Sequence, residues 1–588
     1  MKLQSALMTI GGMCITGCSR YHNGGKHEVK TCERTYSVKE CAFLTPCARM
    51  QYPLPRCRPT KRTLDAKNTT GATEIASSDS TNTISDSQRD IVKVTCRDLV
   101  QESFADVTTT HVCSDSARTT TQPSQTAGET TTNHEKILYK LVAWAKKIVV
   151  NRDKTAAYIE AVDGTTPMHI PVVVRNTHTH YAQVADIDVG DAITVVASSE
   201  KKSSANAQRP NTVRLVVESE ELGHSFTLHQ SERRSDDTNP VTMNGIYPMT
   251  YLRDHCNLRV RNAIMQSTFR IRAKVTERIF SIFSEMGFIH VTTPSLTNVN
   301  CEGMGEIFQA VAPNPDEDQE GASTFLSVSG QLELEALCSG ISKVWKLGPA
   351  FRADRSDTPR HLCEFWMLEA EMNDVTLPEL IETIHTVIRR TAAVILSECR
   401  DDLTVFDQQC EESVTSRLTV VESSKLNTLT YTNATELLND LKQQDPSCEH
   451  TAVRWGEPLT AAHERSLLKA TGQPLLAITH YPTSIMPFYM ERLPDGTVNN
   501  VDLLANGVGE VAGGSIREVR HDILKSAMQE HNVHGSEYDQ YLELRKFGNV
   551  THGGFGIGFE RLLMFLLGIQ NIRDVIHFPR LRKKHVIE

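Results

Sequence analysis

The sequence predicts an α+β protein built from a disordered N-terminal extension, a small β-barrel, and a larger domain in which helices flank an antiparallel sheet. We expect the extension over residues 1–133, the barrel over residues 136–225, a hinge over residues 226–250 and the larger domain over residues 251–588. Three observations support this prediction: a polar segment that cannot form a core, a series of short strand patterns, and a long region with a helical stripe, a charged hairpin and a glycine-rich strand.

Length and composition exclude several classes of protein. A chain of 588 residues is long enough for several domains with a large core. The net charge of -10 gives no general nucleic-acid signature. It does not exclude RNA, because many RNA enzymes are basic only where they touch it. The 15 cysteines include no CxxC pair, so we expect reduced thiols and neither a zinc ribbon nor a disulfide scaffold.

The first 133 residues differ in composition from the rest of the chain. The modestly apolar run from Leu3 to Cys18 is interrupted by glycines; it could be a weak signal-peptide core and is too short for a membrane span. From Arg20 to Lys67 basic residues outnumber acidic ones by eleven to four, which suits a transit peptide. Residues 68–133 are rich in Ser, Thr, Asn and Asp, which predicts disorder. We expect an organelle of mitochondrial or plastid type; the alternative is an untargeted tail on a cytoplasmic protein.

The barrel is predicted from short apolar and β-branched runs separated by turn residues. Turns are indicated by Gly164, Pro167, Gly190 and Pro210. So many strands within one short span predict a small closed barrel. The candidate strands are Tyr139–Val142, Ile148–Val150, Ala157–Ala161, His169–Val174, Ala192–Ala197 and Val213–Val217.

The larger domain opens with a long amphipathic helix. Apolar side chains recur on one face at Ile271, Val275, Ile279, Phe283 and Met286, and Gly287 follows. An extended segment, Phe288 to Pro294, comes next. The spacing alone fits a helix packed in the core and a helix at a subunit interface equally well.

The stretch from Phe351 to Met372, FRADRSDTPRHLCEFWMLEAEM, predicts an antiparallel hairpin with a long charged loop. A pocket for a polyphosphate and a purine needs cations, an aromatic plate and acceptors on a rigid sheet. The alternative is a surface hairpin whose charges are solvated.

Two later segments favour phosphate chemistry. Asp502 and Glu510 lie in VDLLANGVGEVAGGSIRE, and two carboxylates near phosphates can hold Mg²⁺ through oxygen ligands. The run GGFGIGFER, which ends at Arg561, is not GxGxxG in a βαβ unit, so a Rossmann domain is excluded. A strand entering a helix with Arg561 in its first turn is a suitable phosphate site.

Together these segments resemble the three signature motifs of class II aminoacyl-tRNA synthetases, in the form found in asparaginyl-tRNA synthetases of bacterial type. The helix and strand around Ile271–Pro294 resemble the first motif, the hairpin the second, and GGFGIGFER the third. The resemblance covers roughly residues 247–580. It implies a class II catalytic domain, a homodimer built through the first motif, and an OB-fold anticodon-binding barrel.

The resemblance also assigns roles to single residues. It implies catalysis by Arg352, Arg561 and Glu510, with ATP and Mg²⁺ as cosubstrate and cofactor. On the phosphates of ATP it implies Arg352 (α-phosphate), Arg561 (γ-phosphate), and Arg360 and His361, which would also touch the tRNA end. On adenine it implies Phe365, stacked on the ring, and Asp354, which contacts the amino group and stands where the family usually has Glu. Asp502 and Glu510 would hold Mg²⁺. The family also carries a mobile loop resembling Cys301–Phe308 and a triplet matching His463-Glu464-Arg465, whose role the sequence leaves open.

Substrate specificity is indicated around Gln331. Aspartyl enzymes of this class place a lysine three residues after the glutamine, where this chain has Leu334. A buried site with one fewer cation favours a neutral amide over an anion. The resemblance places Gln331, Glu335, Glu369 and Arg517 on the amino acid, although Gln331 and Glu335 could simply begin a helix.

In the barrel, Tyr158 falls where the family has a Phe that stacks on an anticodon base, and a tyrosine ring would serve equally. Pro171 replaces a glutamine that reads a base edge.

The resemblance therefore implies an asparagine–tRNA ligase that uses L-asparagine, ATP and tRNA(Asn), with no membrane partner. The rivals are an aspartyl-tRNA synthetase and a noncatalytic RNA-binding paralogue.

Overall fold

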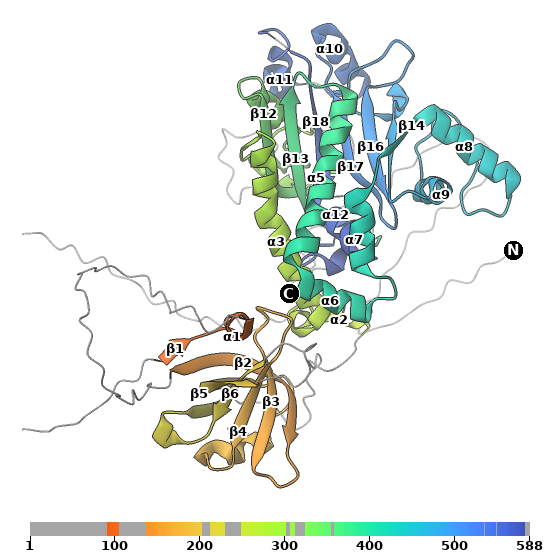
Figure 1. Cartoon of the computed structure of the whole chain (residues 1–588). Coiled ribbons are helices and arrows are strands. Elements are labelled where there is room, and N and C mark those ends of the chain that lie inside the picture. The colour runs from red at the N-terminus through yellow and green to blue at the C-terminus, as the bar shows by residue number, and fades with distance from the viewer. Residues whose placement is uncertain are drawn as a thin grey trace, which may run out of the picture. The chain divides into compact units, whose positions relative to one another are not determined.

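The computed structural model describes residues 91–104, 137–202, 212–229, 248–301, 306–311, 324–353, 358–533, 535–548 and 550–581. These residues form a β-barrel and a larger α+β domain (Figure 1), and each is described by itself below. Within the described part of the chain, no helix combines the length and apolar character needed to cross a bilayer.

The barrel is closed by five strands. The hydrogen-bonded order is β2–β3–β4–β6–β5, and β5 pairs again with β2. Side chains on alternate positions of β2, including Leu141, Ala143 and Ala145, are buried in its core, as the two-residue period of a strand requires. The predicted small barrel is thus confirmed. The strands are β2 (Leu138–Val150), β3 (Ala156–Val162), β4 (Ile170–Arg175), β5 (Ala192–Lys202) and β6 (Thr212–Val217), with the 3₁₀ turns η1 (Thr179–Asp186) and η2 (Glu220–Leu222).

Two elements extend the barrel on the N-terminal side of the predicted range. Strand β1 (Ile91–Lys93) pairs in parallel with β2, and helix α1 (Cys96–Phe104) follows it. Cys96 and Leu99 are fully buried in the barrel core. The prediction of disorder over residues 1–133 is therefore wrong for residues 91–104, because the polar composition of the whole segment hid one short apolar stretch. The remainder of that segment lies outside the described residues.

The predicted hinge, residues 226–250, is also shorter than expected. Strand β7 (Ser225–His229) pairs with β5 at the edge of the barrel sheet, and Phe226 is fully buried. Helix α2 (Met249–Asp254) begins before the predicted end of the hinge. Residues 230–247 lie outside the described part of the chain.

The larger domain is organised around an eight-stranded sheet. Its order is β14–β15–β16–β17–β18–β13–β12–β8, and every neighbouring pair from β15 to β12 is antiparallel. This confirms the antiparallel sheet. The strands are β8 (Ile289–His290), β12 (Lys343–Phe351), β13 (Glu364–Asn373), β14 (Asn427–Thr430), β15 (Leu475–Thr479), β16 (Asn500–Ala505), β17 (Gly509–Ile516) and β18 (His552–Gly558); β9 (Leu296–Thr297), β10 (Gln309–Ala310) and β11 (Thr324–Leu326) form a small second sheet.

Helices cover the sheet as the periodicity predicted. Helix α3 (Ala263–Glu285) is capped by the Asn262 side chain, which accepts from the Ile264 amide at 3.0 Å. Its predicted stripe lies in the main core with α5, beside which it packs in Figure 1. The remaining helices are α4 (Gln331–Cys338), α5 (Leu377–Glu398), α6 (Arg400–Gln409), α7 (Val414–Ser423), α8 (Tyr431–Gln444), α9 (Ala461–Thr471), α10 (His521–Glu530), α11 (Asp539–Glu543) and α12 (Phe559–Leu567).

The predicted hairpin is formed by β12 and β13, with Phe351 opposite Glu364. Because side chains alternate along a strand, the even positions Leu368, Ala370 and Met372 join the core. The odd positions 365, 367, 369 and 371 line a cavity on the opposite face. The hairpin therefore builds one wall of the candidate site.

Candidate active site

The larger domain contains a cavity of about 810 Å³ over the sheet. Its lining comes from β13, β17, β18, the first turn of α12 and the loop after β12. The structure thus brings together most of the residues singled out in the sequence. The predicted residues that line it are Gln331, Leu334, Arg352, Arg360, His361, Phe365, Glu369, Asp502, Glu510, Arg517 and Arg561. Asp354 and residues 302–305 of the predicted mobile loop lie outside the described residues.

One wall of the cavity carries a flat aromatic ring beside a cation and an imidazole. The Arg352 guanidinium carbon lies 5.6 Å from the centroid of the Phe365 ring. His361 Nδ1 lies 2.6 Å from the Thr358 hydroxyl, which holds the imidazole at the cavity edge. A ring face, a guanidinium and an imidazole beside strands β12 and β13 can bind a planar base and its phosphates.

Arg360 is held in place by the triplet whose role the sequence left open. Its Nη1 donates to Glu464 Oε2 at 3.0 Å and to the Val508 carbonyl at 2.7 Å. His463 instead caps α9, with its Nδ1 accepting from the Thr460 amide. Arg465 pairs with Glu449 on the surface. Only the middle residue of the triplet therefore acts on the site, by orienting Arg360.

Arg561 lies in the first turn of α12, as predicted. Its Nη1 donates to the Glu510 carbonyl at 2.9 Å and lies 3.6 Å from Glu510 Oε2. Burial lowers the pKa of Arg561, and the neighbouring Glu510 only partly offsets this effect. A partly buried cation at the start of a helix is a favourable partner for an anionic phosphate.

Asp502 and Glu510 face the same space. A Cβ built on Gly513 would lie 3.4 Å from Glu510 Oε1 and 3.6 Å from Asp502 Oδ1, so both carboxylates border the gap left by this glycine. Burial, followed by the charge of Glu510, raises the pKa of Asp502 well above its usual value. A divalent cation with oxygen ligands fits this donor set, because it would offset the repulsion between the two carboxylates.

At the inner end, Glu369 accepts several hydrogen bonds. Its Oε2 lies 3.0 Å from Lys346 Nζ, its Oε1 accepts from the Gly330 amide at 3.1 Å, and the Ser329 hydroxyl also donates to it. Lys346 and Ser329 were not singled out in the sequence. These contacts fix a negative charge at the cavity wall, suited to an ammonium group.

Beside Glu369, Arg517 forms a two-point ion pair with Glu371. The Nε–Oε1 and Nη2–Oε2 distances are both 2.9 Å, and both side chains are almost fully buried. Glu371 was missed in the sequence, although the strand period places it on the same face as Glu369. Gly554 lies directly opposite Glu371 on β18, and a Cβ there would overlap the Glu371 carboxylate.

Glu335 lies behind this pair and does not line the cavity. Its carboxylate accepts from Arg545 Nη2 at 2.6 Å and from the Tyr541 hydroxyl at 3.0 Å, and it lies 3.8 Å from Arg517 Nε. Burial would raise the pKa of Glu335, but Arg545 and then His552 outweigh it and hold the pKa well below its usual range. Glu335 is thus placed to support Arg517 from behind. Gln331 begins α4 and Glu335 follows one turn later, as the helix alternative predicted.

Position 334 places a neutral side chain at the cavity. Leu334 lines the cavity and is almost fully buried. Gln331 also lines it, with its Nε2 donating to Glu335 Oε1 at 3.0 Å.

In the barrel, Tyr158 lies on β3 with 40% of its surface exposed, so its ring is accessible for stacking.

Comparisons with known proteins agree with this geometry. Residues 249–582 match the family model of class II tRNA synthetases (D, K and N). An asparagine–tRNA ligase of Idiomarina loihiensis is 37% identical over 421 residues, which cover 67% of this chain and 89% of that protein. An asparaginyl-tRNA synthetase of Mus musculus is 39% identical over 58% of this chain and 72% of its own.

A solved structure is similar in both fold and sequence. The asparaginyl-tRNA synthetase of Pyrococcus horikoshii, in complex with asparaginyl-adenylate, superimposes with a TM-score of 0.63 at 25% identity, over 76% of this chain and 95% of that one. The class II fold, the small barrel before it and the enzymatic nature of the chain are therefore confirmed. The chain belongs to the class II aminoacyl-tRNA synthetases, within the family of asparagine–tRNA ligases.

Proposed function

We propose that this chain activates L-asparagine with ATP and transfers it to the 3′ end of tRNA(Asn). The observation that carries the choice of amino acid is the buried Arg517–Glu371 pair beside Leu334. A carboxamide offers one acceptor and one donor group, which match a guanidinium and a carboxylate. The carboxylate of aspartate would instead meet the charge of Glu371 without an added cation from position 334.

The first reaction step follows from the positions of the other groups. Glu369 receives the substrate ammonium, which directs the α-carboxylate toward the α-phosphate. Arg352 and Arg561 stabilise the charge that develops on the phosphates, and Phe365 supports the adenine ring. Asp502 and Glu510 would hold Mg²⁺, which supplies further charge neutralisation when bound. The carboxylate oxygen displaces pyrophosphate, so the protein contributes position and electrostatics with little covalent chemistry.

The partners are proposed from three separate surfaces. Arg360 and His361, at the cavity edge, would receive the terminal adenosine of the tRNA. Tyr158 would stack on an anticodon base. A homodimer is supported by the exposed apolar residues Phe280, Ile289 and Leu296, which lie on α3, β8 and β9. Sedimentation of the purified chain tests the dimer, and a monomer at micromolar concentration would contradict it.

Delivery to an organelle is supported by the basic composition of residues 20–67. Two relatives match this chain over 89 and 94% of their own length but over only 67 and 75% of this chain, so this chain carries residues beyond those that they match. Fusing residues 1–90 to a fluorescent protein tests the proposal. Diffuse cytoplasmic fluorescence would contradict it.

Pyrophosphate exchange with each amino acid tests the activity. Exchange should depend on asparagine and should be faster with asparagine than with aspartate. Faster exchange with aspartate would support an aspartyl-tRNA synthetase. No exchange with any amino acid would support a noncatalytic RNA-binding paralogue. Leu334→Lys should reduce kcat/KM for asparagine, because it places an unpaired charge near a neutral amide. Leu334→Met, which keeps volume and neutrality, is the matched control.

A further inference from the structure

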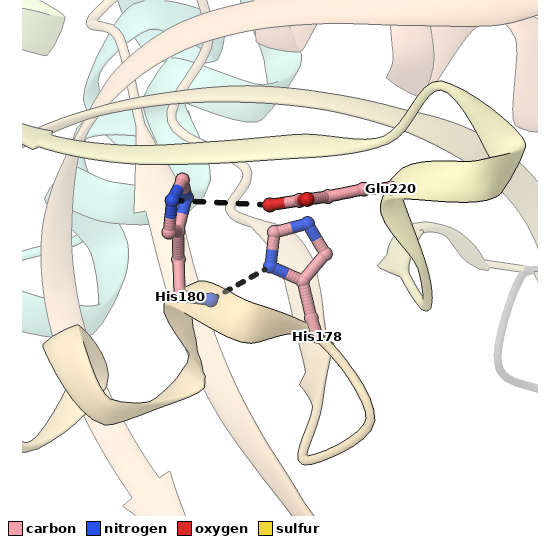
Figure 2. Close-up of side chains that lie close together, drawn as sticks. All are labelled: His178, His180 and Glu220. Atoms are coloured by element: carbon pink, nitrogen blue, oxygen red, sulfur yellow. Dashed lines mark hydrogen bonds and ion pairs between the residues drawn. The ribbon is translucent and has the colours of Figure 1, made fainter.

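The barrel carries a cluster of potential metal ligands that the aminoacylation site does not use. His178 precedes η1, His180 lies within it, and Glu220 begins η2. One nitrogen of each imidazole and one carboxylate oxygen lie within 4.8 Å of one another. Figure 2 shows the three side chains converging from two separate turns. Among the described residues, no other group of three or more His, Cys, Asp or Glu side chains meets the same distance condition.

Backbone carbonyls orient both histidines. His180 Nδ1 lies 3.0 Å from the Phe226 carbonyl. A carbonyl only accepts, so Nδ1 carries a proton, and in the neutral imidazole Nε2 then presents a lone pair. That Nε2 lies 3.9 Å from Glu220 Oε1. A hydrogen bond from the outer imidazole nitrogen to a carbonyl is the arrangement that fixes metal-binding histidines.

His178 follows the same logic with its nitrogens exchanged. Its Nε2 lies 3.3 Å from the His224 carbonyl and its Nδ1 accepts from the His180 amide at 3.2 Å. In the neutral ring the proton therefore resides on Nε2, and the Nδ1 lone pair accepts the His180 amide hydrogen, a bond that a metal ion on Nδ1 would replace. His178 is almost fully buried, so its ring position is set by the barrel. The Thr179 hydroxyl donates to Glu220 Oε1 and orients the third ligand.

The geometry points to a divalent transition metal ion bound by His178, His180 and Glu220. Zinc binds imidazole nitrogen and carboxylate oxygen at about 2.0–2.2 Å in a tetrahedron, which puts ligand atoms about 3.3 Å apart. Closing the cluster thus requires shifts between about 0.6 and 1.5 Å. The side chains of His180 and Glu220, 43% and 51% exposed, have room for such shifts. Water would complete the coordination, and the ion would tie the turn after β4 to the turn after β6.

Zinc binding to the intact, chelator-treated chain tests the proposal. The chain has 22 histidines and 15 cysteines, so the informative quantity is the difference between matched variants. The wild type should bind one zinc ion more than His180→Ala or Glu220→Gln, or bind it more than about 100-fold tighter, since even loss of a group that orients a ligand typically costs 10- to 100-fold. Both substituted positions are partly exposed, so these variants should fold.

His229→Ala is the control, because His229 is an exposed histidine of the same barrel that bonds to Thr194. It should bind zinc like the wild type, and Glu220→His should retain binding because it restores a ligand. Zinc should raise the thermal midpoint of the wild type and of these two variants only. Equal zinc binding by the wild type, His180→Ala and Glu220→Gln would overturn the proposal and leave the cluster as a set of hydrogen bonds between turns.

Discussion

Arg517 and Glu371 form a two-point ion pair with both nitrogen–oxygen distances at 2.9 Å, at a depth where their side chains are 4% and 1% exposed. Water screens such a pair little, and each charge depends on the other. The pair is therefore both a candidate reader of the substrate amide and an element of the fold.

Glu371→Ala should lower the stability of the larger domain by about 3–5 kcal/mol, because it leaves the Arg517 charge without its main partner. The measurement is the urea midpoint of the purified chain. Glu412→Ala is the control, since Glu412 is 80% exposed and pairs with Arg417 at 2.7 Å on the surface; it should cost less than about 1 kcal/mol. Equal losses of stability in the two variants would show that the buried ion pair stabilises the fold no more than an exposed one.

Arg561→Ala should slow formation of asparaginyl-adenylate by about 10²- to 10³-fold, as other lost charge-stabilising groups do. Transfer from preformed adenylate to tRNA should change much less, because pyrophosphate has left by then. Single-turnover kinetics of the two steps measure this, and Arg561→Lys should recover only part of the rate. Equal slowing of both steps would assign Arg561 to the fold instead of to ATP.

Glu464→Gln should raise the KM for ATP by about tenfold, because a hydrogen bond to a charged group that orients Arg360 is worth about 1.5–3 kcal/mol. Pyrophosphate exchange at varied ATP gives the value. The adjacent Arg465→Gln removes only the surface pair with Glu449 and should leave this KM unchanged. A similar rise in both variants would point to a disturbed α9.

His552 should make stability depend on pH. Burial lowers the pKa of His552, but the hydrogen bond and charge of Glu335, with Glu371, outweigh it and raise the pKa above 6.5. The stabilisation is therefore fully present below about pH 6.5 and is lost as pH rises through the raised pKa. The urea midpoint of the wild type should exceed that of His552→Gln most at about pH 6 and progressively less toward pH 9. A constant difference would show that His552 does not titrate in this range.

Leu99→Ala should destabilise the barrel by about 2–5 kcal/mol, since it opens a cavity in a core where Leu99 is fully buried. Thermal unfolding of the full chain measures the effect. Val100→Ala, at the next and only partly buried position, is the control. If Leu99→Ala caused a negligible loss of stability, residues 91–104 would not contribute to the barrel.

Local patterns carried most of the sequence-based prediction. The α3 stripe, the β12–β13 hairpin and the strand entering α12 were predictable because each depends on residues close in sequence. The cavity residues followed from resemblance to a known family. Strand β7 was not predicted, because it is only five residues long and the polar residues that follow it obscure its pattern.

Long-range charge networks were not predictable from local patterns. Glu335 contacts Arg545, which lies 210 residues further along the chain, and Glu371 contacts Arg517, 146 residues away. Only the tertiary fold brings these groups together, because Glu335 lies on α4, Arg545 follows α11, Glu371 lies on β13 and Arg517 follows β17. As a result, Glu335 was assigned to the substrate although it supports Arg517 from behind, and Glu371 was overlooked although it lines the cavity.

Gly554 determines how freely this site can evolve. Its missing side chain leaves the space that the Glu371 carboxylate fills, and the Ala370 carbonyl would lie 2.5 Å from any added Cβ. Even alanine, the smallest replacement a codon change can supply, would displace the partner of Arg517. We therefore expect position 554 to tolerate synonymous codon changes alone, so that the position of Glu371 is protected by a residue that does not itself line the cavity.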